Sequence, residues 1–147
     1  MSDAEYLDWF NREFWRTLHG NGVAALSRLQ RDALCVMNFQ AELDNGGIHQ
    51  YLWNSSGDFA KETPEVFRRI GADEAARILE EAIAFFGAGG PSTDRETRVT
   101  ALLAFPKNVE DRIYVLSKEF YDTEDRGLSL ADLFDAFVLS QRGEGGA

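Results

Sequence analysis

The sequence predicts an all-α fold, in which seven or eight short helices pack as an irregular bundle within a single compact domain. Apolar residues recur at spacings of three and four along most of the chain, and no segment shows the alternation of a half-buried strand. Glycines, prolines and capping residues interrupt this pattern, which keeps the helices short. No repeat or linker divides residues 1–147, so we expect one domain, with residues 143–147 as a frayed tail.

Two helices are predicted in the N-terminal part. Ser2 and Glu5 fit a capping box, in which each side chain satisfies the backbone N–H of the other residue. An apolar stripe at helical spacing follows, formed by Leu7, Phe10, Phe14 and Leu18. Residues 19–22, which include Gly20 and Gly22, are expected to stop this helix. We expect the second helix to run from about residue 23 and residues 45–47 to break it, because glycine accepts the left-handed conformation of a helix end.

The middle of the chain predicts three more helices. A short one covers residues 48–53. Thr63 is expected as the N-cap of the next helix, with Pro64 at its first helical position. The clearest helix opens at Asp73 and ends before the glycine-rich loop 87–90.

The C-terminal part predicts the remaining helices. Thr93 and Glu96 fit another capping box, and Pro106 stops the helix that they begin. Residues 109–121 predict the next helix, and Ser129 is the expected cap of the last one.

Cysteine usage and the chain start indicate an intracellular protein. The single cysteine, Cys35, excludes an internal disulfide, and its neighbours Leu34 and Val36 predict a buried and unreactive thiol. Residues 1–5 are acidic and lack the pattern of a signal peptide, and no apolar run is long enough to span a bilayer. We therefore expect a cytoplasmic protein without a membrane partner.

The chain is acidic, and its acids are unevenly placed. The formal net charge of −10 disfavours direct binding to nucleic acid or to an anionic membrane. Between residues 110 and 135 the acids are opposed only by Arg112, Lys118 and Arg126. We predict that a basic partner binds this surface through Glu110, Asp111, Glu119, Asp122, Glu124, Asp125 and Asp132. The alternative interpretation is a solvated face that keeps the protein in solution.

Amides, carboxylates, aromatic residues and glycines are concentrated in residues 38–58. Glu42, Asp44 and His49 carry metal-binding atoms, but the chain has no HExxH motif and no Glu-x-x-His pair. The serines of this segment do not form the nucleophile elbow of a hydrolase. We therefore expect no metal, no cofactor and no catalytic residue.

A structural role explains the same segment better. The expected core residues are Phe39, Leu43, Tyr51 and Trp53. Amides can satisfy the backbone groups that a helix break exposes, and the candidates are Gln40, Asn45, Gln50 and Asn54. Replacing Asn45 or Gln50 by Ala is then expected to cost roughly 1–3 kcal/mol.

The most specific pattern of the chain consists of Phe39, Glu42, Asn45, Gly46, Gly47, Gln50, Tyr51, Asn54, Ser55, Ser56 and Gly57. This pattern resembles the signature of the DNA mimic protein 19 family, and the likeness covers roughly residues 26–105. The resemblance implies an all-α protein, often a dimer, whose acidic surface imitates the phosphates of DNA and occupies a DNA-binding protein. The signature itself, mostly amides, glycines and aromatic residues, is expected to define the fold.

Two hypotheses about function follow. The first is a non-enzymatic acidic interaction protein, a DNA mimic that binds a basic DNA-binding or transcription-regulatory protein. The second is a small-ligand-binding or hydrolytic protein, whose site would use Glu42, Asn45, His49, Gln50 and Asn54. A homodimer is also expected, and the residues that would mark its interface are Trp9, Trp15 and Phe137.

Overall fold

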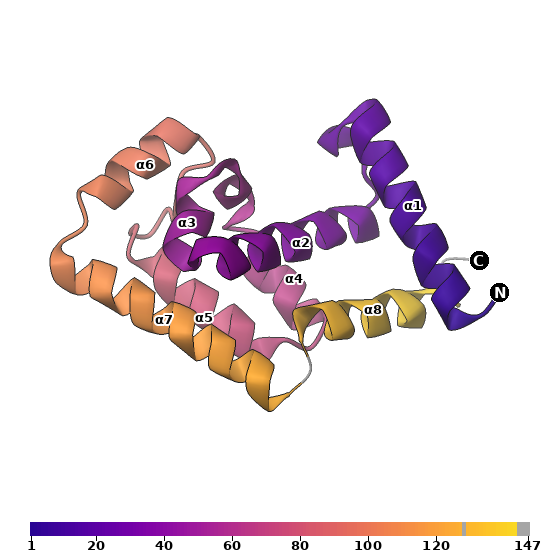
Figure 1. The fold of residues 1–147 in the computed structure, drawn as a ribbon. Helices are drawn as coiled ribbons and strands as arrows, with labels where there is room; N and C mark the ends of the chain where they lie inside the picture. Colours follow the sequence, from indigo (N-terminus) through magenta and orange to yellow (C-terminus); the bar gives the residue numbers. More distant parts are fainter. Residues whose placement is uncertain (128, 144–147) are drawn as a thin grey trace.

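The described part of the chain forms eight α-helices and two short 3-10 helices (Figure 1), which confirms the predicted all-α class. The computed structural model describes residues 1–127 and 129–143, and no strand occurs within them. The expected frayed tail lies outside the described residues except for Gly143. The elements are α1 (Asp3–Asn21), η1 (Val23–Ala25), α2 (Arg28–Gly46), α3 (Ile48–Trp53), η2 (Ser55–Phe59), α4 (Thr63–Arg69), α5 (Asp73–Ala84), α6 (Arg95–Leu103), α7 (Lys107–Arg126) and α8 (Leu130–Gln141).

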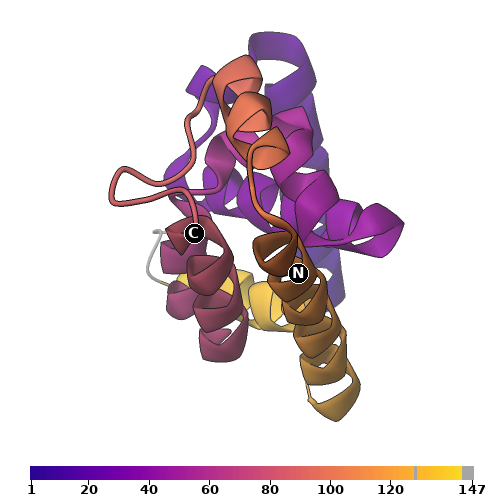
Figure 2. The ribbon, with the colours of Figure 1, turned by 90° about the vertical axis from the view of Figure 1, so that its left-hand side faces the viewer.

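Helix α2 connects the two ends of the molecule. It packs against α3, α4 and α8, while α5 packs on α4 and α7 (Figure 1, Figure 2). Helix α1 lies at the far end from α6 and packs on α8 and η1 (Figure 1). The end of α8 meets the N-terminus there, because Arg142 donates a hydrogen bond to the backbone oxygen of Met1 at 2.6 Å. None of the described helices is long and apolar enough to cross a membrane.

Serine caps fix the starts of three helices. The predicted capping box begins α1, and the predicted cap Ser129 begins α8. A further capping box, formed by Ser27 and Gln30, begins α2 and was not predicted. The second helix therefore starts at Arg28 and not near residue 23, because residues 23–25 form the separate turn η1.

Two predicted threonine caps were wrong. The cap of α6 is Asp94, whose carboxylate accepts the backbone N–H of Thr97 at 3.0 Å, so the cap lies one residue after Thr93. Thr63 lies inside α4, and its hydroxyl donates to the backbone oxygen of Phe59 at 2.7 Å. This hydroxyl faces the core, so it cannot reach the free N–H groups at the start of α4.

One aromatic ring of α2 joins three other helices at the centre of the core. Phe39 is fully buried, and the rings of Tyr51, Phe67 and Phe120 stand edge-on to it at centroid distances of 5.0, 5.0 and 5.2 Å. Edge-to-face packing stabilises such pairs beyond their buried area. The prediction of a buried Phe39 and Tyr51 is thus confirmed, whereas Trp53 is only half-buried.

Stability should fall in alkaline solution because of Cys35. Its thiol is buried, as predicted, and burial raises its pKa from 9.0 to about 11. The unfolded thiol ionises first, so its contribution to stability is complete below about pH 9 and is lost as the pH rises towards 11, by about 1.4 kcal/mol per pH unit. Urea unfolding at pH 8, 9 and 10 measures this slope. The Cys35→Ala variant should lose less stability over the same interval, and an equal loss would contradict the assignment.

Candidate functional site

The family-like segment turns at Gly47, between α2 and α3. This residue has φ +89°, a conformation that side chains other than glycine rarely adopt. Its N–H donates to the backbone oxygens of Glu42 and Leu43 at 3.1 and 3.3 Å, which ends α2. A Cβ atom at this position would lie 2.9 Å from the hydroxyl oxygen of Ser117 on α7. Glycine is therefore required both for the turn and for the close approach of α7, as the sequence predicted for the turn.

Helix α7 satisfies the backbone groups on both sides of this break. The N–H of Ile48, at the start of α3, donates to Ser117 Oγ at 2.9 Å. The hydroxyl of Tyr121 donates to the backbone oxygen of Leu43, in the last turn of α2. The prediction that amides of the segment would do this was wrong, because Asn45 points to solvent and α7 crosses the break with two hydroxyl groups.

The end of α3 is held by Arg98 of α6, whose side chain is 0% exposed. Its guanidinium donates to the backbone oxygens of Leu52, Asn54 and Ser92 at 2.6, 2.7 and 2.8 Å. It also forms an ion pair with Asp58 at 2.9 Å. One side chain thus joins α6, the end of α3, η2 and the loop before α6.

Gly57 leaves room for this arginine. A Cβ atom there would lie 2.7 Å from the backbone oxygen of Tyr51 and 2.8 Å from Arg98 Nε. Ser56 donates its hydroxyl to the same oxygen of Tyr51 at 3.3 Å. The serine and glycine residues of the motif therefore shape a turn around a buried guanidinium.

The remaining polar residues of the motif do not form a catalytic cluster. Glu42 accepts a hydrogen bond from the side-chain amide of Asn54 at 2.7 Å, so these two groups pair with each other. Gln50 is half-buried against Gly46, where a Cβ atom would collide with its side chain. His49 is exposed and stacks on Trp53 with a centroid distance of 5.9 Å. The motif residues pack and pair in support of the fold.

The sequence analysis missed three residues that hold this region: Arg98, Ser117 and Tyr121. A signal for the first two was present. Arg98 precedes Leu102 by four residues, and Ser117 follows Ile113 by four, so each lies on a predicted buried stripe. A polar residue on a buried stripe needs an internal partner. The identity of this partner could not be predicted, because the partners lie 69 positions away in sequence for Ser117 and up to 46 positions away for Arg98.

Four of the seven predicted acidic residues are exposed and unengaged. The side chains of Glu110, Asp122, Asp125 and Asp132 form neither an ion pair nor a hydrogen bond within residues 1–127 and 129–143. Three of them lie on α7, and Asp132 lies in the first turn of α8. A fifth, Asp111, is exposed and pairs with Lys107 one turn earlier at 2.8 Å.

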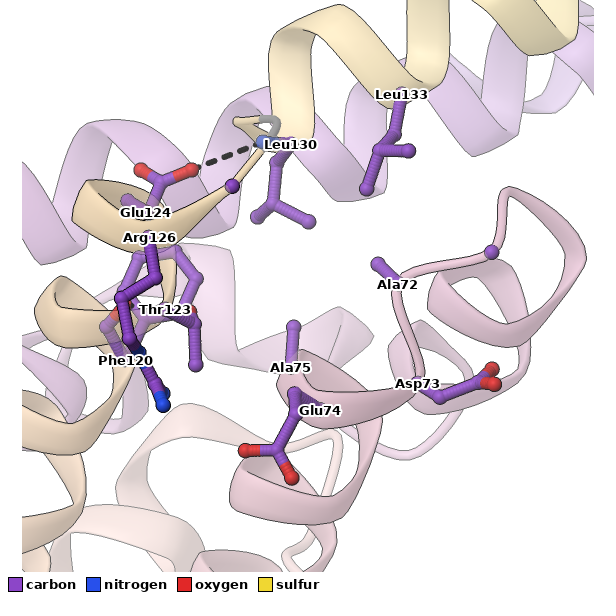
Figure 3. Close-up of a pocket in the computed structure, with 12 residues that line it drawn as sticks. Ala72, Asp73, Glu74, Ala75, Phe120, Thr123, Glu124, Arg126, Leu130 and Leu133 are labelled. Atoms are coloured by element: carbon purple, nitrogen blue, oxygen red, sulfur yellow. Dashed lines mark hydrogen bonds between the residues drawn. The ribbon is translucent and has the colours of Figure 1, made fainter.

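The other two predicted acids have internal partners. Glu124 accepts the backbone N–H of Leu130 at 2.9 Å and so fixes the start of α8 (Figure 3). This contact borders a hollow of about 510 Å³ between α5, α7 and α8, into which Arg126 and Glu74 extend (Figure 3). Glu119 pairs with Arg77 at 3.3 Å.

An ion-pair network fixes α7 against α5. Arg112 of α7 makes two hydrogen bonds to the carboxylate of Glu81 on α5. Arg77 of α5 reaches back to Glu119 of α7, which also lies 3.7 Å from Arg112. The Arg112 guanidinium lowers the pKa of the Glu81 carboxyl through its hydrogen bond. The acidic face of α7 is thus presented by a helix that is anchored along its length.

Residues 24–141 match the model of the DMP19-like protein family. The chain belongs to this family. The match confirms the resemblance seen in the sequence and extends it from about residues 26–105 to residues 24–141, which include α7 and α8. No curated protein and no solved structure matches the chain.

Removing the buried arginine should destabilise the fold. Arg98→Ala leaves three backbone oxygens and a carboxylate without their donor, so we expect a loss of about 3–5 kcal/mol in the free energy of unfolding. Arg95→Ala is the matched control, because Arg95 also donates from α6 to a backbone oxygen, that of Trp53, but at the surface. It should cost under about 1 kcal/mol. Urea unfolding of both variants measures the difference, and equal losses would refute the role of Arg98.

The hydroxyl of Ser117 on α7, and not the side-chain amide of Asn45, should stabilise the break between α2 and α3. Ser117→Ala leaves the buried N–H of Ile48 unpaired and should cost about 1–3 kcal/mol. Asn45→Ala should change stability by less than about 0.5 kcal/mol, because the side chain is exposed. Thermal and urea unfolding of the two variants test this. A larger loss for Asn45→Ala would restore the original prediction.

Proposed function

We propose that this protein is a non-enzymatic interaction protein that binds a basic DNA-binding or transcription-regulatory protein in the manner of a DNA mimic. The observation that carries the proposal is the exposed face of α7, where Glu110, Asp122 and Asp125 have no internal partner among the described residues. Membership of the DMP19-like family supports the same role. Asp111 and Asp132 belong to this surface, whereas Glu119 and Glu124 serve the fold.

The dimensions of the acidic face suit an imitation of DNA. A helix of the length of α7 (20 residues) is about 30 Å long. DNA rises about 3.4 Å per phosphate on one strand, so α7 matches about nine successive phosphates. Unpaired carboxylates on an anchored helix need no rearrangement before they meet a basic surface. The summed charge then accelerates association with a basic partner.

Aromatic residues give this face a means of selecting a partner. Tyr114 is 63% exposed, and Val115 is also exposed on α7. The ammonium group of Lys118 lies 4.9 Å from the centroid of the Tyr114 ring, which shows that the ring already accepts a cation. Exposed tyrosines often supply much of the binding energy of an interface. An arginine of the partner could stack on the same ring.

The alternative, a ligand or hydrolytic site at Glu42 to Asn54, has less support. Glu42 and Asn54 pair with each other, and Asn45 is exposed. Only His49 of the five proposed side chains lines the cleft of about 420 Å³ beside α7.

The homodimer stays a prediction. Trp9 and Trp15 of α1 are exposed, whereas Phe137 is half-buried against the core.

Neutralising the unpaired carboxylates should weaken binding to the partner. Immobilised protein is exposed to a lysate of its own cells, and bound proteins are eluted with duplex DNA, because a mimicked site is shared with DNA. The eluted DNA-binding protein is purified and its affinity is measured. The triple variant Glu110→Gln, Asp122→Asn, Asp125→Asn should bind it roughly tenfold or more weakly, and the wild-type affinity should fall steeply with salt.

A control of equal charge separates position from net charge. Asp8→Asn, Glu65→Gln and Glu96→Gln remove the same three charges from exposed positions on α1, α4 and α6. This variant should retain most of the affinity. Equal losses in both variants would show that net charge alone matters, and a partner that duplex DNA does not displace would contradict mimicry.

A further inference from the structure

A groove opens between α1, α2 and α8, away from the acidic face of α7. Helix α1 packs on α8, and residues of α1, α2 and α8 line a space of about 400 Å³. Apolar side chains from all three helices line it, among them Phe10, Met37 and Phe134. A volume of this size is in the range of small-molecule sites.

The polar groups of this groove are mainly acceptors. Gln40, Asp44 and Asp135 lie in its walls, together with the amide of Asn11, and none of the described residues that line it is a lysine, arginine or histidine. The side-chain amide of Gln40 donates an N–H to Asp44 at 3.1 Å, and the amide oxygen of Gln40 takes no part in this bond. This oxygen, Gln40 Oε1, is buried and has no hydrogen-bond partner within the described part of the chain. The groove therefore offers hydrogen-bond acceptors to a ligand that carries a hydrogen-bond donor.

Asp135 is the charged group that such a donor would meet. Its carboxylate has no ion-pair partner among residues 1–127 and 129–143. Burial raises its pKa above the ordinary value, and the nearby Asp132 adds to this effect. Asp135 is exposed at the rim of the groove, so its carboxylate is shielded from water only in part, and it lies near another negative charge. A cation that arrives there interacts more strongly than it would with a fully solvated carboxylate.

We propose that this groove binds a small organic cation, in which an ammonium group is attached to an apolar body. The body would contact Phe10, Met37 and Phe134, while the ammonium group donates to Asp135; Asp44, which accepts a hydrogen bond from Gln40, adds negative charge to the same groove. An anionic ligand is excluded by the same two carboxylates, and a purely apolar ligand would leave them without a partner. The site includes residues of α1, which precede the residues matched by the family model. It does not depend on the proposed binding of a basic protein by α7.

Three small molecules of similar shape but different charge test whether the groove prefers a cationic ligand. Tryptamine, indole-3-ethanol and indole-3-propionate share a ring and a short tether and differ in being cationic, neutral and anionic. Calorimetry at pH 7 and low salt should give an affinity for tryptamine at least tenfold above that for indole-3-propionate. No binding of tryptamine to the folded protein, or equal affinity for the cation and the anion, would overturn the proposal.

Variants place the binding in the groove. Asp135→Asn should weaken tryptamine at least threefold and leave indole-3-ethanol unchanged, whereas Asp125→Asn on α7 removes the same charge and should leave both unchanged. Ala41→Trp fills the groove from the exposed rim of α2 and should abolish binding of both probes. If this variant fails to fold, Ala131→Trp fills it from the exposed rim of α8. Binding that survives in a folded filled variant, or an equal effect of the two Asp variants, would refute the site.

Discussion

The turn that follows α3 depends on the burial of a single guanidinium group. Removing Arg98 from water is costly, and this cost is offset only because four acceptors surround it at hydrogen-bond distance. Three of the acceptors are backbone oxygens, so the arginine fixes the path of the chain as well as the packing of α6. The fourth, Asp58, is 41% exposed, so its charge remains partly solvated. The surrounding glycine and serine residues follow from the need to bring backbone and guanidinium together.

Helix α7 serves the fold with one face and meets solvent with the other. Its inner face supplies the hydroxyls of Ser117 and Tyr121 to the break between α2 and α3. Its outer face carries exposed carboxylates, such as those of Asp122 and Asp125, that form no hydrogen bond or ion pair within the described part of the chain. Since the two sets of residues do not share partners, changes on the outer face leave the break intact. Binding and stability can therefore be measured separately on the same helix.

Sequence reasoning succeeded where the cause is local. The apolar stripes, the break at Gly47 and the cap Ser129 all depend on residues within one or two turns, and each was predicted. It failed where a polar group finds its partner far along the chain, as Ser117 does with Ile48. The amides of the motif were assigned to the break because they are near it in sequence, although Asn45 is exposed. Nearness in sequence does not show that a distant helix, here α7, packs over the break between α2 and α3 and satisfies its backbone groups.

Acidic groups act differently on the two surfaces proposed as binding sites. On α7 the carboxylates are solvated, so each contributes little, and attraction of a partner requires several of them within a Debye length of about 8 Å at physiological salt. In the groove, Asp135 is exposed at the rim, its carboxylate is shielded from water only in part, and apolar walls limit what can approach it. Selection there depends on shape and on one carboxylate, and salt screens such a contact less. The net charge of −10 therefore does not make the protein a uniform polyanion, because the degree of solvation decides what each acid can recognise.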